Sequence, residues 1–300
     1  MTMYFEELKD ILERIAIALE QISVSMQKDI VNVSNVVKEA THNEAELMSP
    51  KIVDENFIQN FLASRAIKIK VLAQEDKADD IINSLSDFLG KNYQALGEAL
   101  LEIKRNMQKG SSFTLCIKDY TQKHISDTCQ FFLRLYDIAF LEQYSYQKSP
   151  HYIIKAKTTT LPAAQAFFSG KWLERYVLLS VKNAIAKIAL EFDVKINFSY
   201  LLNPQIILPN GDNFELDIIF SVNNSIFWIE AKSGDYQQHI SKYKKIAKLL
   251  GLDYEHSFMV LTDISPERSG ALSVLFDMTV CALPDLENVI LDAIKCDVKT

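Results

Sequence analysis

Asp217, Glu230 and Lys232 stand in two strongly apolar segments of the chain. Two carboxylates held side by side repel each other, and burying them costs free energy unless a cation neutralises them. Carboxylate oxygens are ligands that suit Mg²⁺ or Mn²⁺. Such an ion can polarise a phosphate oxygen and activate water, and a neighbouring ammonium group can stabilise the charge that develops on phosphorus. These residue types therefore favour hydrolysis of phosphodiester bonds.

The two acidic residues are predicted to face each other across a β-hairpin. Residues 223–224 are both asparagine, which forms a good tight turn. A turn at this point pairs Val222 with Ser225 and places Asp217 opposite Glu230. The lysine then lies one step further along the second strand, on the same face as the glutamate, because side chains alternate between the two faces of a strand.

The alternation of residue types predicts which faces are buried. Every even position in the first segment is apolar, so these side chains are expected to share the core face: Phe214, Leu216, Ile218 and Phe220. Glu215 and Asp217 are then expected on the opposite face. The segment 226–232 is apolar on both faces at its start, which predicts a central, buried strand. The alternative is a surface Glu–Lys pair beside an aspartate, worth at most about 1 kcal/mol.

Two short strings in these segments resemble the motif of the PD-(D/E)XK nuclease superfamily. They are FELD, which ends at Asp217, and IEAK, which ends at Lys232. An upstream run, FSGKWLE at residues 168–174, is similar to the helix that opens this fold in some branches. Together the three runs resemble the nuclease half of the CARF-linked CRISPR ancillary nucleases. The resemblance covers about residues 165–285, and Leu216 stands where the motif has proline.

The resemblance implies a restriction-endonuclease-like fold with a metal-dependent nuclease site. A helical glutamate joins the three residues above, so the implied catalytic set is Glu174, Asp217, Glu230 and Lys232. Asp217, Glu230 and the backbone carbonyl of Ala231 would hold the Mg²⁺ or Mn²⁺ ion.

A basic helix is expected directly after these segments, at about residues 235–250. Gln238, Lys242 and Lys245 lie on one stripe of this helix, because they are spaced by four and then three residues. Lys242 is the expected contact to a substrate phosphate, and Gln238 is the second candidate. The alternative is a solvated basic face.

The N-terminal segment carries apolar residues at alternating spacings of three and four, which is the pattern of a coiled-coil seam: Phe5, Leu8, Leu12, Ile15, Leu19, Ile22 and Met26. We therefore expect a helical, coiled-coil-like dimerisation region over residues 1–75, and a homodimer. The alternative is an amphipathic helix that folds back on its own chain.

Residues 76–160 are predicted to form a helix, a short strand, a helix and a hairpin, which is the order of a winged helix. Residues 101–160 carry nine Lys/Arg and five Asp/Glu, a balance of +4, whereas residues 1–60 carry five and eleven, a balance of −6. This asymmetry can mark where a polyanion docks, although chance variation on solvated faces would also produce it. A winged helix serves protein–protein contacts as often as DNA binding. Residues 1–160 show no pattern of a CARF sensor.

Residues 161–300 complete the predicted architecture. A helix is followed by hairpin-connected strands and then by strand–helix alternation, which predicts α/β layers around a mixed central sheet. The chain is thus expected to be an α+β multidomain protein: a coiled-coil-like region at 1–75, a winged-helix-like domain at 76–160, and a nuclease-like domain at 161–300.

Composition limits the setting in which the chain works. A net charge of −7 argues against general coating of nucleic acid. The four cysteines are far apart and form no CxxC pair, which indicates free thiols in a reducing compartment. No secretory signal and no apolar run of membrane-spanning length are visible, so we expect a cytoplasmic protein.

These observations favour a metal-dependent endonuclease in bacterial defence or DNA processing, with two sites brought together by dimerisation. DNA is the expected substrate only from the habits of the superfamily, and RNA stays open. The alternative function is a non-catalytic nucleic-acid-binding or assembly protein that has an inactive nuclease fold.

Overall fold

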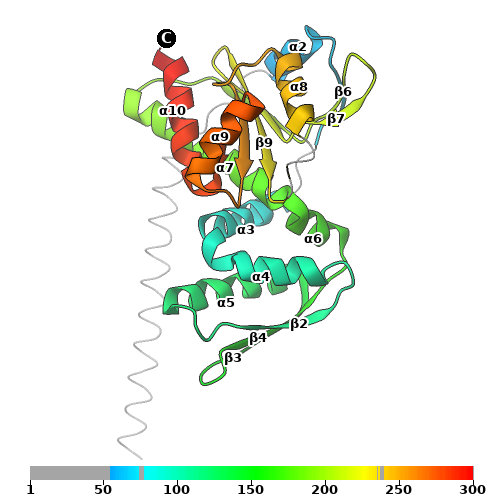
Figure 1. The fold of residues 1–300 in the computed structure, drawn as a ribbon, viewed down its shortest axis with the longest axis vertical. Helices are drawn as coiled ribbons and strands as arrows, with labels where there is room; N and C mark the ends of the chain where they lie inside the picture. Colours follow the sequence, from blue (N-terminus) through cyan, green and yellow to red (C-terminus); the bar gives the residue numbers. More distant parts are fainter. Residues whose placement is uncertain (1–54, 74–77, 235, 237–239, 300) are drawn as a thin grey trace, which may run out of the picture. The chain divides into compact units, whose positions relative to one another are not determined.

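The computed structural model describes residues 55–73, 78–234, 236 and 240–299 (Figure 1). The heptad pattern of the N-terminal segment and Gln238 lie outside these residues, so the dimerisation helix stays a prediction. None of the helices described is both long and apolar enough to cross a membrane.

A five-stranded mixed sheet forms the centre of the C-terminal half, as the strand–helix pattern predicted. Its order is β11-β10-β9-β8-β5. The first three strands run parallel, and β8 is antiparallel to both of its neighbours. The strands are β5 (Phe198–Leu202), β8 (Ile218–Val222), β9 (Ser225–Lys232), β10 (Ser257–Leu261) and β11 (Thr279–Ala282).

The register of the β8–β9 hairpin follows from its turn. Val222 pairs with Ser225 and Ile218 pairs with Ile229, as the two asparagines at the tip predicted. Asn223 has a φ of 52°, in the left-handed region that asparagine tolerates better than most residues. This register brings the predicted site residues to one end of the hairpin.

The expected continuous strand through Asp217 is wrong. The chain instead forms β7 (Asn213–Glu215) in a second sheet, bends at residues 216–217, and then enters β8. The bend is held because the Leu216 N–H donates to the Pro204 carbonyl and the Asn203 N–H donates to the Asp217 carbonyl.

This bend also separates the apolar residues that were expected to share one face. Phe214 and Leu216 belong to the core on one side of the central sheet, whereas Ile218 and Phe220 belong to the core on the other side. The second sheet has the order β1-β6-β7, with β1 (Lys68–Val71) and β6 (Gln205–Ile207).

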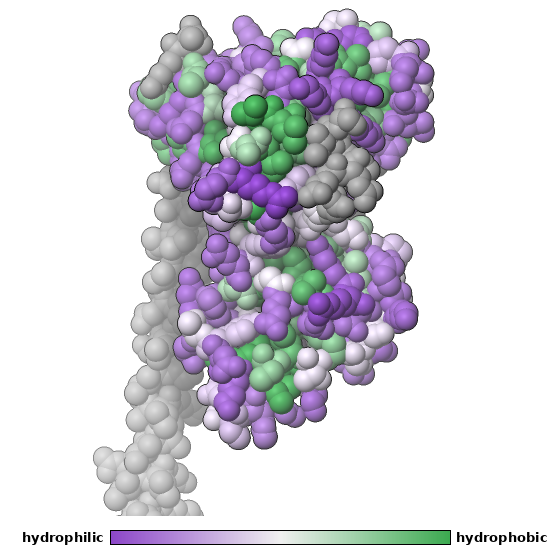
Figure 2. Space-filling view, in the orientation of Figure 1, coloured by the Kyte–Doolittle hydropathy of each residue, from purple (hydrophilic) through white to green (hydrophobic). Residues whose placement is uncertain are grey.

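Helices cover both faces of the central sheet, which explains why β9 is buried along nearly its whole length. One face packs against α7 (Trp172–Phe192) and α10 (Leu286–Lys299). The other packs against α2 (Glu55–Ala63), α8 (Ile240–Leu250) and α9 (Pro266–Phe276). The visible surface is mostly hydrophilic, with apolar side chains in small separate patches (Figure 2).

The elements at residues 55–71 belong to this C-terminal half, although the sequence analysis grouped them with the dimerisation region. Ile58 and Leu62 of α2 are fully buried in the core beneath β8 and β9. β1 pairs antiparallel with β6.

Residues 79–158 form the predicted order of helix, strand, helix and hairpin. The three strands make an antiparallel sheet of order β2-β4-β3. The elements are α3 (Asp79–Lys91), α4 (Tyr93–Asn106), β2 (Ser112–Cys116), α5 (Gln122–Asp137), β3 (Leu141–Gln147) and β4 (Ile153–Thr158). The short helices α6 (Pro162–Ala166) and η1 (Phe167–Lys171) lead into α7, and η3 (Leu283–Asp285) leads into α10.

Gly90 lets this region pack directly on the C-terminal half. A Cβ atom at Gly90 of α3 would lie 2.2 Å from a ring atom of Tyr176 on α7, so only glycine fits at this approach. The apolar side chains of α3, α4 and α5 are continuous with the core beneath α7 and α10. The two regions therefore share one core.

Candidate active site

Asp217, Glu230 and Lys232 meet at the end of the β8–β9 hairpin. The Lys232 ammonium lies 2.7 Å from Asp217 Oδ2 and 2.9 Å from Glu230 Oε2, so it joins both carboxylates. Asp217 sits at the bend before β8, and the other two residues lie on β9. The structure thus brings the three predicted residues into direct contact.

The carboxylates are buried and held by the backbone. Glu230 is 1% exposed and Asp217 is 5% exposed. The Ala231 N–H donates to Asp217 Oδ2 at 2.8 Å, and the Asp217 N–H makes a longer bond of 3.4 Å to Glu230 Oε1. The strand pairing ends before residue 217, so the Ala231 N–H donates to the Asp217 side chain and not to a backbone carbonyl of the neighbouring strand.

Burial and charge shift the protonation of the site. Burial, together with the neighbouring Asp217 carboxylate, raises the pKa of Glu230 to about 8, although Lys232 opposes this shift. Burial lowers the pKa of Lys232, but the two carboxylates outweigh it and raise the pKa above its usual value. The site therefore holds a firmly charged ammonium beside a glutamate that gains and loses its proton near neutral pH.

Glu174 enters the same site from the first turn of α7. Its carboxylate accepts a 2.7 Å hydrogen bond from the Asn203 side chain. Burial and then the charge of Asp217 raise the pKa of Glu174 to about 7, and Lys232 and Lys171 lower it. The helical glutamate implied by the resemblance is therefore close enough to the strand residues to share their field.

The donor set fits a hard divalent cation that keeps water in its coordination shell. Asp217 and Glu230 supply carboxylate oxygens, which such ions prefer. If the antiparallel register continued, Leu216 would pair with Ala231. The Leu216 N–H donates to the Pro204 carbonyl, so it does not donate to the Ala231 carbonyl. Among the described residues, no group of three or more His, Cys, Asp or Glu side chains is placed to hold a metal, so backbone and water must complete the shell.

Two further side chains lie at this site that were not predicted from the sequence. Tyr243 of α8 is buried, and its ring centroid lies 5.6 Å from the Lys232 ammonium. Asn203, which binds Glu174, follows β5 in a turn with a φ of 51°. Neither residue carries a sequence signal of its own, because a tyrosine on an amphipathic helix and an asparagine in a turn both have ordinary structural roles.

No protein-family model and no curated protein matches the chain. Several solved structures do match it, among them the following two. Protein VC1899 from Vibrio cholerae superposes with a TM-score of 0.54 and 17% identity, over 80% of this chain and 60% of that one. Can2 from Sulfobacillus thermosulfidooxidans was solved in complex with cyclic tetra-adenylate. It superposes with a TM-score of 0.52 and 15% identity, over 79% of this chain and 60% of that one.

The chain has the fold of these two proteins. The likeness extends over four-fifths of the chain, so it includes more than the region that carries the nuclease-like strings. The chain spans about 60% of the length of each matched chain.

Lys242, the predicted phosphate contact on α8, does not point toward the carboxylates. Lys242 is exposed, and its ammonium lies 4.6 Å from the ring centroid of Phe214 on β7. Tyr243, the next residue, is the side chain of α8 that faces Lys232. Gln238, the second candidate, lies outside the described residues.

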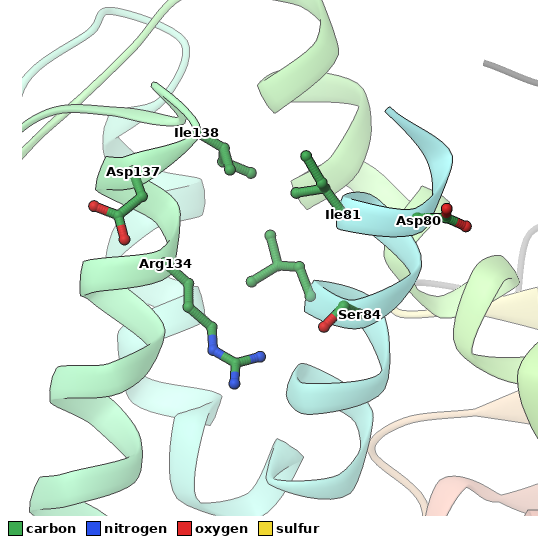
Figure 3. Close-up of a pocket in the computed structure, with 7 residues that line it drawn as sticks. Asp80, Ile81, Ser84, Arg134, Asp137 and Ile138 are labelled. Carbon is green, nitrogen blue, oxygen red and sulfur yellow. The ribbon is translucent and has the colours of Figure 1, made fainter. Parts of the chain in front are cut away.

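A separate cavity of about 400 Å³ lies between α3 and α5, and none of the site residues lines it (Figure 3). Ile81 and Ile138 point toward one another across it, and Arg134 reaches in from α5 (Figure 3). The Arg134 guanidinium also packs over the Phe88 ring, 4.4 Å from its centroid. This cavity belongs to the packing of the helices and plays no part in the carboxylate site.

Proposed function

We propose that the chain is a divalent-metal-dependent nuclease that hydrolyses phosphodiester bonds, with DNA as the favoured substrate. One observation carries this proposal: two buried carboxylates, one at the bend before β8 and one on β9, lie within 3 Å of the same lysine ammonium. Well-packed apolar residues would often serve stability as well as a buried ion pair or better. A charged cluster at the end of a buried strand therefore suits a chemical role.

Each residue has a role that its position supports. Asp217, Glu230 and the Ala231 carbonyl would hold Mg²⁺ or Mn²⁺, and such an ion would supply Lewis acidity and activate water. Lys232 stabilises the charge that develops on the phosphoryl group and positions the attacking water. Glu174, whose pKa is raised to about 7, accepts a hydrogen bond from that water near neutral pH.

The wider setting rests on two supports. The strings of the site resemble the CARF-linked CRISPR ancillary nucleases, and the fold resembles Can2, a protein solved with cyclic tetra-adenylate. We place the chain in bacterial defence on these grounds and expect it to work as a cytoplasmic homodimer. The element order of residues 79–158 supports a winged helix there, and the positive balance of residues 101–160 suits a nucleic-acid partner.

The test is a cleavage panel of single- and double-stranded DNA and RNA with Mg²⁺, Mn²⁺ or EDTA. Cleavage should require the metal and should fall about a thousandfold in Lys232→Ala and Asp217→Ala. Lys91→Ala is the control, because Lys91 is exposed on α3 and pairs only with Asp87 among the described residues. Equal cleavage by all four proteins would refute the site.

The second candidate function is a non-catalytic nucleic-acid-binding or assembly protein. It is favoured by the ion pairs of Lys232, whose ammonium contacts both carboxylates without a metal. Calorimetric titration with Mn²⁺ separates the two functions. Binding that Asp217→Asn abolishes supports the nuclease, and a flat titration supports the binding protein.

A further inference from the structure

Helix α4 lies across the end of the sheet at which β9 and β10 finish. The Tyr93 hydroxyl, at the first residue of α4, donates to the Asp263 carboxylate at 2.9 Å, two residues after β10 ends. Near the other end of α4, the Lys104 ammonium donates to Ser233 Oγ at 3.3 Å. Ser233 directly follows Lys232 in the sequence. The helix therefore delivers a cation to the edge of the carboxylate site.

The Lys104 ammonium is partly buried, and the group to which it donates is a neutral hydroxyl. Within the described ranges no carboxylate lies within 4.0 Å of its ammonium. Burial lowers its pKa, and the charge of Asp263 opposes this shift. Removing a charge from water without a counter-charge costs free energy, so this position is better explained by an anion that binds there.

The elements that carry Lys232 and Lys104 indicate which kind of anion binds there. Lys232 faces Tyr243 of α8, whereas Lys104 comes from α4 and meets the residue that follows Lys232. A polyanion that passes over the end of β9 would therefore run between two ammonium groups, one contributed by β9 and one by α4. Lysine binds phosphate as a compact point charge, which suits a flexible backbone contact.

We propose that Lys104 binds a backbone phosphate of the nucleic-acid substrate next to the bond that is cut, which makes α4 part of the substrate-binding site. This assignment rests on the proposed nuclease function. It adds a residue outside the region that carries the PD-(D/E)XK resemblance. It also gives the region that contains α4 a direct part in substrate binding.

Two matched substitutions on α4 test the assignment. Lys104→Met removes the charge and keeps the apolar stem. Arg105→Met removes the same charge one residue away, where the side chain is 62% exposed and pairs with Glu102 at 2.6 Å. KM and kcat are measured on the substrate identified by the cleavage panel, and binding of the same oligonucleotide is measured in EDTA over a series of salt concentrations.

Lys104→Met should raise KM by about tenfold and leave kcat within about threefold, because a backbone contact holds substrate without joining the chemistry. It should also reduce the slope of log Kd against log salt by about 0.7 to 0.9, the value of one phosphate contact. Arg105→Met should leave KM, kcat and slope nearly unchanged. Lys104→Arg should restore most of the binding.

Thermal unfolding separates binding from folding. Lys104→Met should keep its melting temperature, because the substitution removes a partly desolvated charge. If both methionine variants change KM and the salt slope equally, or if neither changes them, Lys104 has no specific contact and the assignment is overturned. A wild-type protein that neither binds nor cleaves any nucleic acid overturns the nuclease proposal itself. If the wild-type protein cleaves and Lys104→Met has the same KM and salt slope, this inference alone is overturned.

Discussion

Lys232 stands where two carboxylates need a positive charge. It lies 2.7 Å from one and 2.9 Å from the other, and both carboxylates are almost fully removed from water. Binding of a divalent cation would supply the same charge from the open end of the site. The lysine is then free to turn toward substrate. At the residue scale, the proposed metal ion would therefore compete with protons and the ammonium group for the same oxygens.

Metal affinity should rise with pH because protons compete for these oxygens. The pKa of Glu230, a proposed metal ligand, is raised to about 8, so this carboxyl is largely protonated at about pH 6. Metal ligands must be deprotonated. We expect Mn²⁺ affinity, measured by calorimetry, to increase about tenfold or more between about pH 6 and about pH 8.5.

Glu230→Gln provides the control for this pH dependence. The variant lacks the titrating carboxyl with the higher pKa, so it should bind Mn²⁺ weakly and with a flatter response to pH. Equal affinity of the wild-type protein at both pH values would contradict the protonation scheme, and so would an unchanged slope in the variant.

At the element scale, the contact between α3 and α7 depends on a glycine. A Cβ atom at Gly90 would lie 2.2 Å from the ring of Tyr176, which belongs to a helix that carries Glu174. Gly90→Ala should therefore lower the free energy of unfolding by about 1 to 3 kcal/mol through overpacking. Chemical denaturation measures this change.

Gly97→Ala is the matched control, because Gly97 lies within α4 and a Cβ there meets nothing within 4 Å. This substitution should stabilise the protein by up to about 1 kcal/mol through helix propensity alone. If both alanine variants were equally stable, α3 and α7 would not be in the close contact described.

His256 connects the entry of β10 to helix α10. Its ring nitrogens lie 2.6 Å from Asp253 Oδ1 and 2.9 Å from Asp297 Oδ2, and its ring packs on Phe227. Burial lowers the pKa of His256, but its hydrogen bonds with the two aspartates outweigh this effect and raise it above 6.5. The native state therefore favours the charged imidazole.

This charge should stabilise the fold at low pH and not at high pH. Because the folded pKa is raised, the contribution is complete below about pH 6 and disappears as pH rises through the folded pKa. His256→Phe should lower the free energy of unfolding by about 1 to 2 kcal/mol at about pH 6, with a smaller difference at about pH 9. His151→Phe, at an exposed loop residue, is the control for placing a phenylalanine elsewhere in the fold. A constant difference for His256→Phe would mean that only packing was lost.

The elements differ in how far the sequence determined them. The turn at residues 223–224 and the alternation along the hairpin correctly predicted that Val222 pairs with Ser225, because both signals are local. The break after β7 could not be predicted, because it depends on bonds from Leu216 to Pro204 and from Asn203 to Asp217 that form only in the folded chain. The strict alternation across that break was misleading for the same reason.

The arrival of side chains from distant elements was equally hidden. Lys104 reaches Ser233 across 129 positions of sequence, and Tyr243 reaches Lys232 only because α8 packs on one face of the sheet. Nothing in the sequence around either residue distinguishes it from a solvated lysine or a core tyrosine. The sequence thus predicted Glu174 and the acidic and basic residues of the hairpin, whereas Lys104 and Tyr243 reach them only through tertiary packing.

At the scale of the whole molecule, the number of sites in one particle decides what a nuclease can cut. A single carboxylate site cuts one strand at a time, and coordinated cleavage of a duplex needs a second site. The apolar seam of the N-terminal segment predicts a dimer that would provide it. We expect the chain to sediment as a dimer in analytical ultracentrifugation and to convert supercoiled plasmid directly to linear product.

A charge placed in that seam should separate dimerisation from cleavage at each site. Leu19→Asp introduces a charge at an apolar seam position, whereas Gln21→Asp introduces the same charge at a polar position two residues away. Leu19→Asp should sediment as a monomer and should nick plasmid before linearising it, with little change in the rate per site on short single strands. Gln21→Asp should behave as the wild-type chain. If Leu19→Asp still sediments as a dimer and still linearises plasmid in one step, another surface joins the two sites. The apolar seam would then pack within its own chain.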